Sequence, residues 1–276
     1  MINFLGLKDI FLKFLQPLRA TQDLLINNQF KNDLINPKNP FNRFGKRCFS
    51  QCDEDGISLE IVKRLNIKKG IFCEIGCDTG LQNNTLILAS LLWNGIWIDK
   101  RDLVIDYNKF KRLKFFKETV TTSNIVGLIK GGLTNFISKE LDCISIDIDS
   151  CDYHIVETIL KNSIFPKFFI VEINQKFPPP IEFVADNDAK TIYNKDYYGA
   201  SLYSFYKLFS KYNYTLICCS LIMGHNAFFI QNKYLDLFKD VPKDINDIYI
   251  TPNYWSFSHS FKTGSTKEMV EEIFKD

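Results

Sequence analysis

Two pairs of polar residues, each with a spacing of two, close segments that look like buried strands. Asp147 and Asp149 belong to the stretch ISIDIDSCDYH, and Glu172 and Asn174 close VEIN. Side chains of a strand alternate between its two faces, so each pair lies on one face if the strand continues through it. Carboxylate and amide oxygens suit Mg²⁺, Mn²⁺ or Ca²⁺. The pattern predicts that Asp147, Asp149, Glu172 and Asn174 hold a divalent ion or, without one, substrate hydroxyls.

A glycine-containing turn follows the first predicted strand. In EIGCDTG, Glu74 precedes Gly76 and Gly80, and a helix opens soon after. Such a turn lets a ligand approach the backbone, and the helix N-terminus offers unpaired N–H groups. There is no glycine two residues after Gly76, so the turn departs from the dinucleotide fingerprint. Asp99 ends the second predicted strand, where an acid can accept hydrogen bonds from ribose hydroxyls.

A proton acceptor is expected near these carboxylates, and histidine titrates closest to neutrality. His154 begins the helix after Asp149 and is the first candidate, and His225 lies in the last strand turn. Lys176, after the fifth strand, and Asp147 complete the catalytic candidates. Histidine also has many structural roles, so a base outside the histidines stays open.

Strands and helices alternate from about residue 50 onward, which implies crossover connections and a mainly parallel sheet covered on both faces. We expect an α/β, doubly wound Rossmann-like sheet with an antiparallel strand at one edge. The predicted strands are 70–76, 95–99, 113–120, 141–149 and 167–174, followed by two strands around a turn near Gly224. The predicted helices are 57–66, 83–93, 123–130, 152–162 and 199–212.

Residues outside this pattern divide the chain into three parts. Residues 1–45 read as a helical extension, 46–240 as the main domain, and 241–276 as a tail with a helix expected at 265–275. The segment 175–200 contains three consecutive prolines and little periodicity, and a connection of this length at a strand end favours a substrate-covering loop.

Composition excludes several classes of protein. The chain has 276 residues, 46% of them hydrophobic and 24% charged, with a net charge of +2 and no basic blocks, so no nucleic-acid partner is implied. The eight cysteines lie in or beside apolar segments, which favours a reduced, cytoplasmic protein. The spacings Cys48/Cys52 and Cys73/Cys77 permit zinc, although the second pair spans a strand and the loop after it.

The N-terminal stretch is apolar but interrupted by Lys8, Asp9 and Lys13, so neither a signal peptide nor a transmembrane segment is expected. Its apolar residues recur at helical spacing. We expect a helix that packs on the main domain or forms a homo-oligomer with a second copy; a helix lying on a membrane surface is the alternative.

The ordered elements resemble class I S-adenosylmethionine-dependent methyltransferases, whose first motif is Glu-x-Gly-x-x-x-Gly. The resemblance implies that the turn from Gly76 to Gly80 passes around the methionine portion, that Asp99 holds the ribose, and that residues after the third strand flank adenine. The cofactor residues implied in this way are Glu74, Gly76, Cys77, Gly80, Asn84, Thr85, Asp99, Val120 and Thr121.

Within that class, SQCDEDG, NNTLILA, SIDIDSCDYH, VEIN, YYGASL and NAFF resemble the FkbM type over about residues 50–232. Asp149 stands where that pattern carries Glu. The carboxylates are also similar to those of metal-dependent O-methyltransferases of catechols and macrolide sugars, which implies Mg or Mn.

The resemblance implies methyl transfer to an oxygen, most readily a sugar hydroxyl of a sugar nucleotide destined for capsule or lipopolysaccharide. Two alternatives remain: a NAD-dependent oxidoreductase that uses the same turn and acid, and a non-catalytic polysaccharide-assembly subunit of the same fold.

Overall fold

The computed structural model describes residues 15–18, 20–22, 24–25, 28, 31–32, 37–187, 198–222 and 224–251. The chain divides into two compact units, Met1–Pro37 and Lys38–Asp276. The 3-10 helix η1 (Pro40–Phe44) belongs to the second unit. The helix expected at 265–275 and residues 188–197 of the long loop lie outside the described residues.

In the first unit, the described residues between 15 and 32 are helical. Leu18, Leu24 and Leu25 are each more than 60% exposed. In the described part of the chain, no helix is long and apolar enough to cross a membrane.

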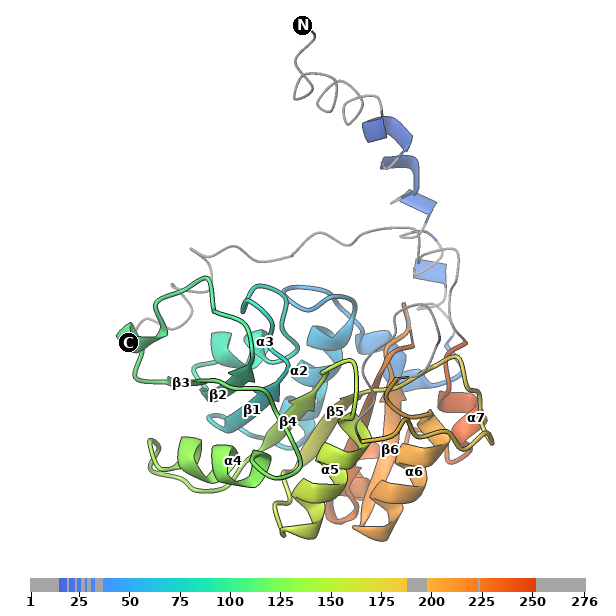
Figure 1. The fold of residues 1–276 in the computed structure, drawn as a ribbon. Helices are drawn as coiled ribbons and strands as arrows, with labels where there is room; N and C mark the ends of the chain where they lie inside the picture. The colour runs from blue at the N-terminus through green and yellow to red at the C-terminus, as the bar shows by residue number, and fades with distance from the viewer. Residues whose placement is uncertain are drawn as a thin grey trace, which may run out of the picture. The chain divides into compact units, whose positions relative to one another are not determined.

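The second unit is built on one seven-stranded sheet, with the order β3-β2-β1-β4-β5-β7-β6 (Figure 1). This is the doubly wound, Rossmann-like sheet that the alternation of elements predicts. Only β7 runs antiparallel to its neighbours, and it lies one place in from the edge strand β6. The strands are β1 (Ile71–Ile75), β2 (Asn94–Asp99), β3 (Leu113–Lys117), β4 (Cys143–Ile146), β5 (Phe168–Glu172), β6 (Tyr214–Cys219) and β7 (Asn226–Gln231).

Helices cover both faces of the sheet (Figure 1). One face packs against α4 (Ile125–Leu133), α5 (Asp152–Lys161) and α6 (Leu202–Lys211). The other packs against α2 (Glu54–Arg64), α3 (Leu86–Ser90), η1 and 3-10 helix η3 (Asn232–Phe238). The short η2 (Tyr107–Lys109) precedes β3, and α7 (Ile245–Ile248) follows η3. The central strands are therefore buried on both sides, as their continuous apolar runs require.

Helix α2 shows how local sequence sets its position. It carries Glu54 and Asp55 in its first turn and Lys63 and Arg64 in its last, an arrangement that complements the helix dipole. Its N-terminal acids are nevertheless fully buried. Asp55 accepts hydrogen bonds from the N–H groups of residues 48–50, so the acids also shape the segment before the helix.

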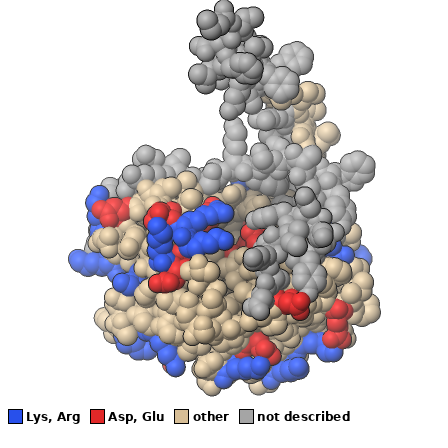
Figure 2. Space-filling view, viewed as in Figure 1, with Lys and Arg blue, Asp and Glu red and all other residues tan. Residues whose placement is uncertain are grey.

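Charges on the visible surface are mixed. Lys and Arg side chains stand beside Asp and Glu on the face drawn in Figure 2. No field of one sign covers this face, in keeping with the small net charge.

Candidate active site

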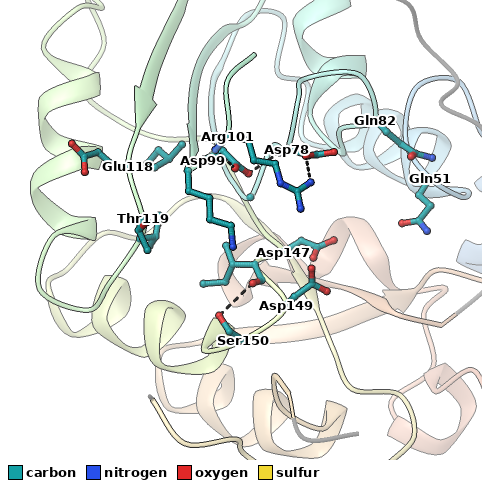
Figure 3. Close-up of a pocket in the computed structure, with 15 residues that line it drawn as sticks. Gln51, Asp78, Gln82, Asp99, Arg101, Glu118, Thr119, Asp147, Asp149 and Ser150 are labelled. Atoms are coloured by element: carbon teal, nitrogen blue, oxygen red, sulfur yellow. Dashed lines mark hydrogen bonds and ion pairs between the residues drawn. The ribbon is translucent and has the colours of Figure 1, made fainter. Parts of the chain in front are cut away.

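A cavity of ≈ 550 Å³ lies at the carboxyl ends of the central parallel strands (Figure 3). Its walls come from the turns after β1, β2, β3 and β4 and from the segment before α2. Ligands of open α/β sheets bind at this edge, where the strand order reverses, here between β1 and β4. The lining residues are Gln51, Gly76, Asp78, Gln82, Ile98, Asp99, Lys100, Arg101, Glu118, Thr119, Val120, Asp147, Ile148, Asp149 and Ser150.

The turn after β1 lies directly against the turn after β4. Gly76 has φ = +89°, and a Cβ added there would lie 1.7 Å from the carbonyl oxygen of Asp147. Its N–H also donates to the carbonyl of Ile98 at 2.9 Å. Gly80 has φ = +86°, and a Cβ added there would lie 3.1 Å from the Trp97 ring. Glycine is therefore required at position 76 by both conformation and space.

Several residues that the resemblance assigns to the cofactor lie behind the cavity wall. Glu74 is buried, and its carboxylate accepts hydrogen bonds from the N–H groups of Asn84 (2.8 Å) and Thr85 (3.2 Å) and from the Asn83 amide (3.2 Å). The Thr85 hydroxyl also donates to it. Glu74 thus fixes the segment that opens α3. Of the predicted cofactor residues, Glu74, Cys77, Gly80, Asn84, Thr85 and Thr121 do not line the cavity, whereas Gly76, Asp99 and Val120 do.

The buried Glu74 predicts a pH dependence of stability. Burial raises the pKa of Glu74 from 4.5 to about 7, against the opposing effect of its hydrogen bonds. The folded state therefore binds more protons than the unfolded state between these values, and stability falls as pH rises through this window, by about 3 kcal/mol at most. Glu74→Gln mimics the protonated carboxyl and should remove that part of the fall. Urea unfolding at pH 5 and 8 measures it; exposed Glu140→Gln is the control, and an unchanged pH dependence in Glu74→Gln would contradict the assignment.

Asp99 lies where the sequence places the ribose-binding acid, at the end of β2. One carboxylate oxygen accepts the N–H of Asp78 at 2.7 Å, and the other accepts the N–H of Arg101 at 2.8 Å. These bonds fix the carboxylate at the cavity wall (Figure 3). A carboxylate oxygen has further lone pairs, which remain available to ligand hydroxyls.

Asp147, Asp149 and Glu172 come together as predicted, but by a different route. Each offers a carboxylate oxygen within 4.8 Å of the others. The expectation that β4 continues to Asp149 is wrong, because the strand ends at Ile146 and Asp149 has φ = +57°. The cause is Asp152, fully buried, which accepts the N–H groups of Ile148 (2.8 Å) and Ser150 (3.1 Å). A tight turn therefore aims both aspartates at the cavity (Figure 3).

The carboxyl cluster is electrostatically costly. Burial raises the pKa of Asp147 well above its ordinary value, and the neighbouring Asp149 and Asp152 raise it further. Burial, followed by the charge of Asp147, does the same to the pKa of Glu172. Glu172 Oε2 is buried with no hydrogen-bond partner among the described residues. A clustered set of oxygens with one unpaired atom fits a hard divalent cation.

The other predicted site residues are placed as follows. Asn174 follows β5, and its amide donates to the Tyr198 carbonyl at 3.1 Å while its oxygen accepts the N–H of Lys176 at 3.3 Å. In α5, His154 Nε2 lies 3.0 Å from the Ala185 carbonyl. His225 is buried beside Glu54, with its Nε2 3.7 Å from Oε1. None of these four predicted residues is among those that line the cavity.

Sequence reasoning missed most of the charged residues at the cavity. Asp78 and Arg101 form an ion pair there, beside Asp99 (Figure 3). A local signal existed, because Asp78 lies inside the glycine turn and Arg101 follows Asp99 by two residues. Gln51 carries no such signal, since it lies in an irregular segment whose course depends on buried acids in the next helix.

Comparisons with known proteins find likeness of fold only. No family model matches the chain, and no curated protein does. Among solved structures, a 1,6-didemethyltoxoflavin-N1-methyltransferase of Burkholderia thailandensis, with bound S-adenosylhomocysteine, is 9% identical, covering 63% of this chain and 74% of its own, with a TM-score of 0.39. An O-methyltransferase family 2 protein of Planctomyces limnophilus is 11% identical, covering 59% and 51%, with a TM-score of 0.34. The methyltransferase domain of a bacterial Hen1 protein is 13% identical, covering 64% and 96%, with a TM-score of 0.35.

Proposed function

We propose that this chain is an S-adenosylmethionine-dependent O-methyltransferase. The observation that carries the proposal is the single cavity that joins Gly76, Asp99 and Val120 to Asp147 and Asp149. The first three offer a close backbone approach, a hydroxyl acceptor and an apolar contact, which suit a nucleoside with an amino-acid tail. The two aspartates offer oxygens to a polar acceptor in the same space. Binding of a nucleoside and an acceptor in the same cavity removes most of their translational and rotational freedom before the reaction, which lowers the entropic part of the barrier.

The cofactor half of the proposal predicts an effect at Asp99. Asp99→Ala removes the hydroxyl acceptor and the partner of two backbone N–H groups. We expect S-adenosylhomocysteine to bind on the order of 10- to 100-fold more weakly, which corresponds to the loss of one or two charge-assisted hydrogen bonds. Asp102→Ala is the matched control, because Asp102 is exposed and pairs with Lys117. Calorimetry measures both, and equal affinity of the two variants would remove Asp99 from the site.

The acceptor half rests on Asp147, Asp149 and Glu172. We propose that these carboxylates hold Mg²⁺ or Mn²⁺, with Asn174 on the same strand end in support. When bound, such an ion holds acceptor oxygens and favours the alkoxide form of the attacking hydroxyl. The chain's own residues orient it: Asp152 fixes the turn that carries both aspartates, and β5 presents Glu172 beside them.

Among the four proposed proton acceptors, only Asp147 lines the cavity in the described part of the chain. We therefore rank Asp147 first as the proton acceptor. His154 ranks below it, because its Nε2 already lies 3.0 Å from the Ala185 carbonyl oxygen. His225 and Lys176 follow.

A sugar hydroxyl, on a sugar nucleotide for capsule or lipopolysaccharide, is the proposed acceptor, because paired carboxylates and an ion bind adjacent hydroxyls. The test is transfer of a labelled methyl group to a panel of sugar nucleotides, with a chelator and with Mn²⁺ restored. Transfer that a chelator stops and Mn²⁺ restores supports the whole proposal. Methyl transfer that continues in the presence of the chelator would support the methyltransferase proposal and exclude a required ion.

Two competing functions predict different ligands. A NAD-dependent oxidoreductase of this fold would bind NAD and not S-adenosylhomocysteine, although the turn lacks the middle glycine of the dinucleotide fingerprint. A non-catalytic assembly subunit would bind neither ligand and methylate no sugar nucleotide.

We also propose that the N-terminal helix forms a homo-oligomer. The exposed Leu18, Leu24 and Leu25 support this, since exposed apolar side chains favour a partner surface. A chain that starts at Lys38 should have a lower oligomeric mass by light scattering and keep its S-adenosylhomocysteine affinity. The same oligomer in both chains would exclude this role.

A further inference from the structure

A second group of potential metal ligands shares no residue with the carboxylates Asp147, Asp149 and Glu172. Cys52, Glu54 and His225 each offer one ligand atom, and these three atoms lie within 4.8 Å of one another. Cys52 lies two residues before α2 and Glu54 is the first residue of that helix, whereas His225 precedes β7. Residues more than 170 positions apart in the sequence therefore meet at one buried point. Neither cysteine spacing noted in the sequence accounts for it, because Cys48 is not part of the cluster.

The cluster is closed from solvent and incompletely bonded. Cys52 and Glu54 are 0% exposed, and His225 is 7% exposed. Both ring nitrogens of His225 are buried without a hydrogen-bond partner among the described residues. Leaving a buried polar group unpaired is unfavourable, so such groups normally have a hydrogen-bond partner. This imidazole therefore has room for a partner that the described residues do not supply.

The distances fit a tetrahedral ion. Zn²⁺ binds sulfur at about 2.3 Å and nitrogen or oxygen at about 2.0 to 2.2 Å, so its ligand atoms lie about 3.3 to 3.8 Å apart. His225 Nε2 lies 3.7 Å from Glu54 Oε1. The remaining pairs, at no more than 4.8 Å, need only a side-chain adjustment to close.

We propose that Cys52, Glu54 and His225 form a Zn²⁺-type site that ties the start of α2 to the β6–β7 connection. Thiolate, imidazole and carboxylate together select Zn²⁺ over Mg²⁺ or Ca²⁺, which prefer all-oxygen sets. Three protein ligands leave one position of a tetrahedral ion open.

Surrounding bonds already hold the two segments together and orient the ligands. Asn226 Nδ2 donates to Glu54 Oε1 at 3.0 Å, and the other oxygen, Oε2, accepts the Cys52 N–H at 2.9 Å. Asp53 accepts the Leu221 N–H at 2.9 Å. Ligand carboxylates in metal sites are commonly fixed by such outer hydrogen bonds. Because Gln51 lines the active-site cavity, the ion would also fix one wall of that cavity.

Cobalt substitution tests the proposal on the full chain without any enzyme assay. Co²⁺ bound by a thiolate gives a sulfur-to-cobalt charge-transfer absorption that an all-oxygen site lacks. We expect one equivalent of Co²⁺ with this absorption, displaced by one equivalent of Zn²⁺. Cys52→Ser should abolish the absorption, and His225→Gln should weaken Co²⁺ binding on the order of 100-fold.

Two controls separate this site from its surroundings. Cys48→Ser, four residues from Cys52 and outside the cluster, should keep the absorption, and so should Asp149→Asn in the acidic carboxylates. Binding of Co²⁺ without the absorption, equal loss in Cys48→Ser, or no binding at all would each overturn the proposal. If Cys52→Ser does not fold, the loss of Co²⁺ affinity in His225→Gln tests the same site. The cobalt absorption does not depend on methyl transfer, so the experiment can disprove this metal site without affecting the proposed function, and the reverse.

Discussion

Replacing Gly76 with alanine should abolish measurable binding of S-adenosylhomocysteine and destabilise the fold by about 3 kcal/mol or more. The added Cβ would lie 1.7 Å from the Asp147 carbonyl oxygen, and φ = +89° is unfavourable for alanine. Backbone strain of this kind costs about 1 to 3 kcal/mol, and the clash adds to it by separating the turns after β1 and β4. These turns form two walls of the cavity.

Gly127→Ala is the matched control for Gly76→Ala. Gly127 lies in α4, and a Cβ there meets nothing within 4 Å. Alanine should stabilise that helix by about 0.5 to 1 kcal/mol and leave ligand affinity unchanged. Urea unfolding and calorimetry measure both variants. A Gly76→Ala protein that binds S-adenosylhomocysteine normally would show that the turn after β1 is not the ligand site.

Substitutions of Asp147 and Glu172 should have opposite effects on the stability of the metal-free protein and on metal binding. Asp147→Asn or Glu172→Gln removes a half-buried like charge, so the metal-free protein should gain about 1 to 2 kcal/mol. Burial, followed by like charges, raises both pKa values, so the folded protein resists ionisation and loses stability as pH rises above the ordinary carboxyl pKa. The gain from either substitution should therefore be larger at pH 8 than at pH 5.

The same substitutions should remove the stabilisation that Mn²⁺ gives the native protein. Binding of an ion to the folded state alone raises the melting temperature in proportion to the logarithm of its concentration. Thermal unfolding with and without Mn²⁺ measures this shift, and Asp236→Asn, at an exposed surface carboxylate, is the control. A Mn²⁺ shift retained in Glu172→Gln, or absent from the native protein, would remove the ion from these carboxylates.

The sequence predicted the sheet well because periodic apolar runs and glycine turns are local signals. The central strands, the crossover helices and the antiparallel strand near the edge follow from these runs. The end of β4 was misplaced, because its extent depends on Asp152, whose backbone contacts close a turn that alternation alone does not reveal. Helix α3 is likewise shorter than its apolar pattern predicts, since Glu74 holds residues 83–85 in the turn before it.

The candidate site was predicted in part. Gly76, Asp99, Asp147 and Asp149 meet at one cavity because all follow parallel strands, and strand ends share one edge of the sheet. Glu74 reads as a ligand residue in the sequence but is buried among backbone donors, a distinction that needs three-dimensional contacts. The pairing of Cys52 and Glu54 with His225 was beyond sequence reasoning, since it depends on α2 meeting the β6–β7 connection.

The most direct test of the central claim is calorimetric titration of S-adenosylhomocysteine into the purified chain, with and without Mn²⁺ and with NAD as the control ligand. We expect saturable binding of S-adenosylhomocysteine at one site per chain and no binding of NAD. Binding of NAD alone, or of neither ligand under both conditions, would contradict it.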